Sequence, residues 1–331
     1  MTKIPISVLE LAAVVKGGNH SSAIESTVAV ARHIESLGYT RIWMAEHHNM
    51  EYIASSATSV LIGHVAGKTN SIRVGSGGIM LPNHSPLVIA EQFGTLASIY
   101  PGRIDLGLGR APGTDQLTAR ALRRNNLDAS LNFPNDVKQL QTYFSKSNSA
   151  AKVRAFPGEG LDIPIWILGS STDSAYLAAQ MGLPYTFAAH FAPTHFRQAI
   201  AIYREHFRPS AYLDKPYVMA CVNVLGADTD EEASALLSSL VAMFIGIITN
   251  VRSPLQAPGH LPAEYNIPEV RSAINSMLAC TFTGNSASLR TKLSDFIDDT
   301  KIDELMVATY IYDNEAKLKS FSILRDALEI V

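Results

Sequence analysis

The sequence has few cysteines, few charged residues and no basic block, and each shortage argues against a class of protein. Cys221 and Cys280 are the two cysteines in 331 residues. They are too few for a disulfide framework, so a reducing, cytoplasmic location is expected. The 27 basic and 30 acidic residues are intermixed, which argues against a nucleic-acid partner. With 17% charged and 47% hydrophobic residues, the chain should fold around a large core.

No segment of the sequence is predicted to enter a membrane. Residues 1–11 are interrupted by Pro5 and Glu10 and lack the apolar stretch of a signal peptide. The most apolar later run, residues 236–249, falls short of the roughly 20 residues that span a bilayer, so we expect a buried helix there. The protein is therefore expected to be soluble.

Short apolar runs alternate with amphipathic stretches along the whole chain. Most of the short runs are continuously apolar, which is typical of strands buried on both faces of a parallel sheet. The predicted strands are residues 4–11, 41–46, 72–80, 104–109, 164–169, 185–189, 217–225 and 304–312. The predicted helices are residues 21–37, 55–67, 87–99, 173–181, 194–207, 229–249 and 315–329.

A βα unit repeated about eight times predicts a single α/β domain over residues 1–331. It fits either an open doubly wound sheet or a (β/α)8 TIM barrel. An open sheet that binds a nicotinamide cofactor needs G-x-G-x-x-G directly after the first strand, and residues 12–18 do not match it. The barrel is therefore the preferred prediction, with insertions after strands four and seven.

The two insertions break the alternation of strands and helices. Residues 111–133 are polar, and residues 250–277 are rich in proline, asparagine and serine. We expect residues 250–277 to form a long mobile loop of the kind that covers active sites.

Functional residues of a TIM barrel gather at the C-terminal ends of its strands, and the first candidate segment there is Ala45-Glu46-His47-His48-Asn49. Adjacent histidines on an extended segment point to opposite sides, so at most one faces the barrel mouth. That histidine could move protons near neutral pH, or both could simply bond to neighbouring loops. The histidine spacing fits no metal motif, so no metal is expected.

The second and third candidate segments are rich in glycine. In Gly75-Ser76-Gly77-Gly78, the lack of side chains on a buried strand indicates either a planar ligand lying on the strand or tight packing against a helix. In Leu108-Gly109-Arg110, the arginine could bind a ligand phosphate with two hydrogen bonds, or it could pair with a nearby carboxylate.

The fourth candidate segment, Gly169-Ser170-Ser171-Thr172-Asp173-Ser174, lies where a predicted strand meets its helix. Free N–H groups and small hydroxyl side chains at a helix N-terminus can bind an anion, and such residues can equally cap the helix. Together with Arg110, they favour a phosphate site.

Across these four segments the chain resembles the luciferase-like flavin-dependent monooxygenases. The stretches AEHHN (45–49), SGGIMLPNHSPLVIAEQFGTL (76–96), PGRIDLGLGRAPG (101–113) and LGSS (168–171) occur in the same order as in a non-luminescent bacterial subgroup. The resemblance covers nearly the whole chain and implies a TIM barrel. It also implies that reduced FMN from a separate reductase reacts with oxygen to oxidise a small organic substrate, and that the protein forms a homodimer.

The resemblance assigns roles to individual residues. His47 matches the catalytic histidine that supports the oxygen adduct of the flavin. The flavin ring is expected to lie over a cis peptide bond between Gly77 and Gly78, next to Ser76. The FMN phosphate is expected at Arg110, Gly169, Ser170, Ser171 and Ser174.

Two positions depart from the family pattern. Gly109 stands where the luciferases carry a cysteine beside the flavin, so that thiol is absent. Tyr52 replaces a small residue near the expected pocket, which would narrow the pocket or change its substrate.

Two other functions fit the same residues. One is a deazaflavin-dependent oxidoreductase on the same barrel, which would transfer a hydride and ignore oxygen. The other is a flavin-binding protein without turnover, which would keep FMN bound and oxidise nothing.

Overall fold

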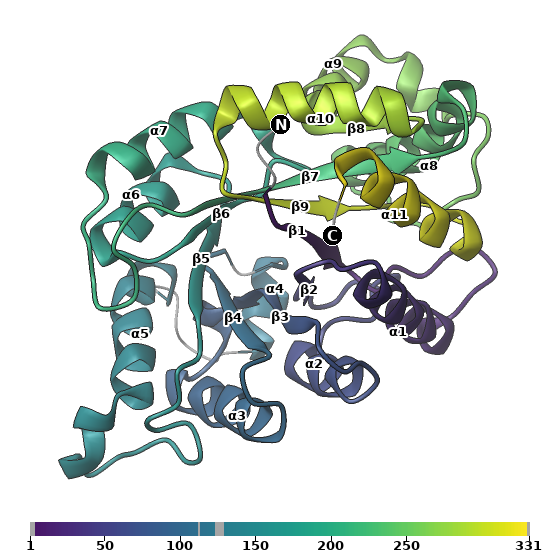
Figure 1. Cartoon of the computed structure of the whole chain (residues 1–331). Helices are drawn as coiled ribbons and strands as arrows, with labels where there is room; N and C mark the ends of the chain where they lie inside the picture. The colour runs from purple at the N-terminus through teal and green to yellow at the C-terminus, as the bar shows by residue number, and fades with distance from the viewer. Residues whose placement is uncertain (1–3, 112, 123–128, 330–331) are drawn as a thin grey trace.

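Eight parallel strands close into a barrel at the centre of the protein (Figure 1). The structure, a computed structural model, describes residues 4–111, 113–122 and 129–329. The strands follow one another as β6-β5-β4-β3-β2-β1-β9-β7, and the pairing of β6 with β7 closes the ring. The predicted strands and the predicted TIM barrel are confirmed. The barrel strands are β1 (Ile6–Glu10), β2 (Arg41–Met44), β3 (Arg73–Met80), β4 (Ile104–Gly109), β5 (Ile165–Gly169), β6 (Tyr185–Phe187), β7 (Val218–Gly226) and β9 (Glu304–Ala308).

A further strand, β8 (Thr281–Gly284), lies outside the ring and was not predicted. The long strand β7 serves two partners, since its first part pairs with β9 and its last part pairs with β8. The partner changes at Asn223, which is in register with Ala308 of β9 and with Thr281 of β8. Strand β8 is short, and most of its residues are half-buried. Its sequence therefore contains no apolar run that would predict a strand.

The barrel strands are apolar at successive positions because both of their faces are buried. Ile42 and Met44 of β2 pack outward with the helices, whereas Trp43 between them points into the barrel. Inside, the Trp43 ring meets the Trp166 ring of β5 edge-on, with the ring centres 5.2 Å apart. Side chains therefore fill the interior, as in other barrels of this size.

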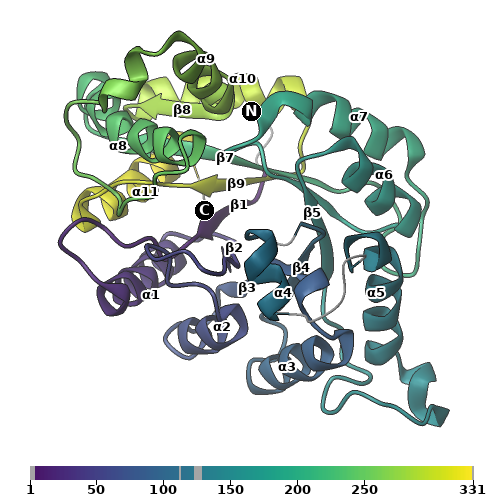
Figure 2. The ribbon, with the colours of Figure 1, turned by 180° about the vertical axis from the view of Figure 1, so that it is seen from behind.

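Helices cover the outside of the ring (Figures 1 and 2). Thr229 and Glu232 form a capping box at the start of one of them, α8. The helices that match predicted ones are α1 (His20–Ser36), α2 (Thr58–Ala66), α3 (Pro86–Ile99), α6 (Thr172–Met181), α7 (Phe196–His206), α8 (Asp230–Ile248) and α11 (Asn314–Leu328).

The two segments predicted to be insertions both contain helices, although residues 250–262 form a loop as expected. In residues 111–133 lie α4 (Gln116–Leu122) and the start of α5 (Ala129–Phe144); residues 112 and 123–128 of this segment lie outside the described part. In residues 250–277 lies α9 (Pro268–Met277). The helix α10 (Ser286–Thr300) was not predicted either.

The missed helix α5 has a recognisable cause. Phe133, Val137 and Leu140 are buried at helical spacing, but Pro134 lies inside the helix. Proline usually ends a helix, because it lacks an N–H and clashes with the preceding turn. The proline therefore obscures the apolar helical pattern that the other residues of α5 form.

The described part of the chain has one helix, α8, that is long and apolar enough by length and composition to cross a membrane. Its Leu240, Val241, Phe244 and Ile245 are buried in a hydrophobic cluster that includes side chains of the barrel interior. The buried helix expected at residues 236–249 is therefore observed as part of α8.

A buried ionic cluster fills the N-terminal end of the barrel. Arg41 at the start of β2 binds Asp105 of β4 at 2.7 Å and Glu304 of β9 at 2.8 Å, and both carboxylates are fully buried. Ser7 and Tyr217 donate further hydrogen bonds to Glu304. Because these residues lie at the starts of parallel strands, the cluster occupies one end of the barrel and leaves the other end for ligands.

We predict that Arg41→Leu lowers the free energy of unfolding by about 3–5 kcal/mol, because the buried Glu304 loses its cation and the buried Asp105 keeps only its ion pair with Arg73. The control is Arg197→Leu, since the side chains of the Arg197–Asp299 pair are 70% and 53% exposed; this change should cost less than about 1 kcal/mol. Urea unfolding followed by circular dichroism measures both losses. Equal losses would contradict a stabilising role for the cluster.

Candidate active site

His47 follows the end of β2 and lines an open hollow of about 520 Å³ between the start of α1 and the loop after β2. Its Nδ1 lies 3.4 Å from the carbonyl oxygen of Gly113. Burial lowers the pKa of His47 below its ordinary value, so the imidazole is neutral at pH 7. Tyr52, which departs from the family pattern, does not line this hollow.

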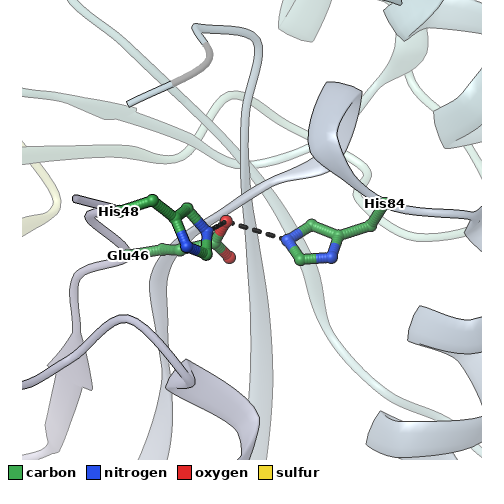
Figure 3. A group of neighbouring side chains, drawn as sticks. All are labelled: Glu46, His48 and His84. Carbon is green, nitrogen blue, oxygen red and sulfur yellow. Dashed lines mark hydrogen bonds and ion pairs between the residues drawn. The ribbon is translucent and has the colours of Figure 1, made fainter. Parts of the chain in front are cut away.

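Glu46 binds two histidines that follow different strands (Figure 3). Its Oε1 accepts a hydrogen bond from Nε2 of His48 and another from Nε2 of His84, each at 2.8 Å, and the carboxylate is 1% exposed. Burial acts to raise the pKa of Glu46, but the two histidine hydrogen bonds outweigh it, and the pKa lies below its ordinary value. The triad ties the end of β2 to the segment after β3, beside His47.

The two adjacent histidines therefore have different partners, and of the two only His47 lines the hollow. The ligand atoms of Glu46, His48 and His84 lie within 4.8 Å of one another, close enough to hold a metal ion. Their 2.8 Å separations are hydrogen-bond distances, however, and both imidazoles bind the same carboxylate oxygen. We therefore describe the group as a hydrogen-bonded triad.

We predict that Glu46→Gln lowers the free energy of unfolding at pH 7 by about 1–3 kcal/mol, because two imidazoles lose a buried, charged acceptor. A carboxylate whose pKa is lowered in the folded state stabilises the fold above its ordinary pKa and loses that contribution as the pH falls through the folded value. The difference between wild type and variant, measured by urea unfolding, should therefore shrink in acid. Glu51→Gln, at an exposed position in the same loop, is the control. A difference that does not change with pH would contradict the role of the charge.

The peptide bond between Gly77 and Gly78 in β3 is cis, as the resemblance implies. A Cβ on Gly77 would lie 2.7 Å from Leu9, and a Cβ on Gly78 would lie 2.8 Å from the carbonyl oxygen of Gly107. Close packing therefore favours glycine at both positions, and the contacts are with strands β1 and β4 and not with a helix. The hydroxyl of Ser76 donates to the carbonyl of Gly107 and accepts from its amide, so this side chain joins β3 to β4.

Arg110 and the N-terminus of α6 come together at the C-terminal end of the barrel. The Arg110 guanidinium, just after β4, lies 3.4 Å from the carboxylate of Asp173 in the first turn of α6. These side chains are 42% and 73% exposed, and a long, exposed ion pair contributes little energy. An anion bound at the helix N-terminus could therefore replace Asp173 as the partner of Arg110.

The predicted cap of α6 is confirmed. Ser171 is the N-cap, and its hydroxyl accepts a long hydrogen bond of 3.4 Å from the Ser174 amide. Ser174 is buried, and its hydroxyl bonds to the Ser171 carbonyl and to the hydroxyl of Tyr185. A Cβ on Gly169 would lie 2.1 Å from the Ser174 hydroxyl. Ser174 and Gly169 therefore pack beneath the N-terminus of α6, whereas the half-buried residues Ser170 and Ser171 border it.

A second histidine near His47 was missed in the sequence analysis. His190 follows β6, which lies across the ring from β2, and it interacts electrostatically with His47. It is 8% exposed, and its Nδ1 has no hydrogen-bond partner. Burial, with a smaller effect of His47, lowers the pKa of His190 to about 3, so its ring is neutral at pH 7. No motif or spacing marks His190, because its position opposite His47 appears only when the ring closes.

A second cleft, of about 370 Å³, lies between α1 and α11 at the ends of β1 and β9. Lys317 and the buried Glu10 form an ion pair of 2.6 Å there. Glu10 and Lys317 are therefore paired with each other, and none of the expected flavin contacts lines this cleft.

A sequence profile of the luciferase-like monooxygenases matches residues 6–277. A luciferase-like monooxygenase of Escherichia coli (strain K12) is 46% identical over 326 residues, which cover 98% of this chain and 97% of that protein. The N-acetyl-S-alkylcysteine monooxygenase of Bacillus subtilis (strain 168) is 31% identical over 335 residues and 98% of both chains. The chain belongs to the luciferase-like monooxygenase family.

Solved structures agree with this assignment. The structure of apo-MsnO8 has a TM-score of 0.89 to this one and 31% sequence identity, over 99% of both chains. The oxygenating constituent of 3,6-diketocamphane monooxygenase from Pseudomonas putida, solved in complex with FMN, has a TM-score of 0.76 and covers 100% of this chain and 99% of its own. At 15% identity, this second match demonstrates a shared fold. The family and its structural neighbours support a flavin-dependent monooxygenase.

Proposed function

We propose that the protein is an FMN-dependent monooxygenase. In this proposal the FMN phosphate binds at the N-terminus of α6, and His47 is the catalytic residue. The observation that carries the proposal is the contact of Arg110 with the first turn of α6. This contact places the Arg110 guanidinium, whose ion pair with Asp173 contributes little energy, at a helix N-terminus, and helix N-termini favour anions.

The residues at this end of the barrel fit a flavin phosphate. The Arg110 fork can donate two hydrogen bonds to phosphate oxygens. The Ser171 hydroxyl makes two long hydrogen bonds, accepting from the Ser174 amide at 3.4 Å and donating to the Ser174 hydroxyl at 3.5 Å, so it can turn toward a bound phosphate. The flavin ring would then lie against the backbone of β3 at Gly77 and Gly78, with Ser76 on the same strand.

His47 would act as a base toward the bound ligands. Its Nδ1 faces a carbonyl oxygen and therefore carries the proton in the neutral ring, which leaves Nε2 as the acceptor. Reduced flavin supplies the electrons for a reaction in which one oxygen atom enters the substrate and the other leaves as water. The role of His47 is to accept or return a proton at Nε2 during this reaction.

The partners follow from the same proposal. No dinucleotide motif follows the first strand, so a separate reductase would supply the reduced flavin. Val60 on α2 and Val88 and Ile99 on α3 are exposed apolar side chains, and a homodimer would cover them. Cys221 and Cys280 are free and buried, which suits a cytoplasmic protein.

We predict that Ser171→Ala weakens FMN binding about tenfold or more, because a charge-assisted hydrogen bond contributes roughly 1.5–3 kcal/mol. Anaerobic titration with oxidised and then reduced FMN measures the loss. The control is Ser145→Ala, since Ser145 caps a short helix after α5 in the same way. Binding of coenzyme F420 in place of FMN would support the deazaflavin alternative, and binding of neither would exclude both functions.

We predict that His47→Gln leaves FMN affinity within about twofold but slows oxidation of the bound reduced flavin by at least about tenfold, as expected for loss of a proton-transfer group. In the wild type, the rate should rise with pH through a midpoint below the ordinary histidine pKa, because the base is the neutral ring. Stopped-flow mixing with oxygenated buffer between pH 5 and 8 measures both. His20→Gln, which changes an exposed histidine on the same hollow, is the control. An unchanged rate and pH profile in His47→Gln would contradict the role of His47.

A further inference from the structure

Three buried polar groups on β6, β7 and the segment after β6 have no hydrogen-bond partner. They are the hydroxyl of Thr186, Nδ1 of His190 and Oδ1 of Asn223. Thr186 and Asn223 point into the barrel, because their neighbours along each strand pack outward with the helices. Buried polar groups are nearly always paired in native proteins, so orphaned ones in one region indicate an unseen partner.

The Asn223 amide has a defined orientation. Its Nδ2 donates to the carbonyl of His190 and to the hydroxyl of Thr281. Because a carbonyl can only accept, the amide cannot turn its oxygen toward His190. Oδ1 is therefore left as an acceptor without a donor, and only a group that brings an N–H or O–H can satisfy it.

These groups lie on the side of the ring opposite the proposed flavin. In the closed order of eight strands, β7 is four places from β3, and β6 is four places from β2. If the flavin lies against Gly77 and Gly78 of β3, one face of its isoalloxazine system contacts β3. The other face then points across the barrel toward β6 and β7. This placement rests on the proposed function.

Neutral and apolar side chains lie close to the orphaned groups. His190 is a neutral imidazole, and the ring of Phe191 packs edge-on against it, with the ring centres 5.0 Å apart. The inward positions nearest Asn223 along β7 are Cys221 and Leu225, which are buried with Ala308 of β9. A carboxylate here would meet Oδ1 of Asn223 without a proton to donate to it.

We propose that Asn223 and His190 form the substrate-binding wall of the active site, and that the substrate is an uncharged organic molecule with an N–H or O–H donor beside an apolar portion. Asn223 accepts the hydrogen bond of that donor. The His190 ring makes a second hydrogen bond through Nδ1, and the apolar portion packs against Cys221, Leu225 and Ala308.

Three probes of equal chain length separate the features of this proposal: hexanamide, methyl hexanoate and hexanoate. The amide is uncharged and donates, the ester is uncharged and does not donate, and the acid is an anion. Each is titrated against the protein with and without FMN, following tryptophan fluorescence and flavin absorbance. We expect the amide to bind at least tenfold more tightly than the other two probes.

The variants Asn223→Leu and His190→Phe should each weaken amide binding at least tenfold and abolish the preference, while FMN affinity stays within twofold. His190→Phe breaks no side-chain hydrogen bond of the folded protein, so it provides the test if Asn223→Leu does not fold. Ser239→Ala is the matched control, because it removes another buried, unpartnered hydroxyl, on α8. It should change nothing.

Equal affinity for the three probes, including no binding of any, overturns the proposal, and so does a preference that survives both variants. If the variants lose FMN and amide together, the two residues contact the flavin and the proposed placement is wrong. If the wild type binds no FMN, the proposed function fails separately, and the titration without FMN still tests the wall.

Discussion

The pairing of β6 with β7, which closes the ring, is the constraint on which the rest of the protein depends. Closure buries both faces of every barrel strand, so the strands must be apolar at successive positions. It also gathers the charges at the strand starts into one buried cluster around Arg41. At the other end it brings His47 and His190, 143 residues apart in the sequence, close enough for His47 to lower the pKa of His190.

The sequence predicts the features that depend on a local residue pattern. It does not predict the features that arise only when the barrel closes. Eight strands, the cap of α6 and the position of Arg110 follow from apolar runs and helix-start residues near one another in the chain. The short strand β8 lacks such a pattern, and in helix α5 an internal proline obscures it. His190 and Asn223 look like ordinary residues of a strand end and a buried strand, and only the completed barrel leaves their polar atoms without partners.

The proposed active site has a charged region at its rim and a neutral region deeper in the barrel. The only strong positive charge among the expected cofactor contacts is that of Arg110, which lies at the rim where solvent reaches it. Deeper in the barrel, burial keeps both His47 and His190 neutral. A charged phosphate can thus be bound without placing an uncompensated charge in the apolar interior, where desolvation would be costly.

The change of partner along β7 gives Asn223 a second significance. Its backbone is in register with the barrel strand β9 and with the outer strand β8, and its side chain bonds to Thr281 on β8. The segment from α8 to α10 is therefore fastened to the barrel at a residue of the proposed substrate wall. If the position of Asn223 sets the affinity of the proposed wall for its ligand, then ligand binding and docking of that segment stabilise each other by thermodynamic linkage. Insertions and substitutions in the outer segment can then retune selectivity from a distance while the ring stays closed, a route by which related enzymes could diverge without rebuilding their barrels.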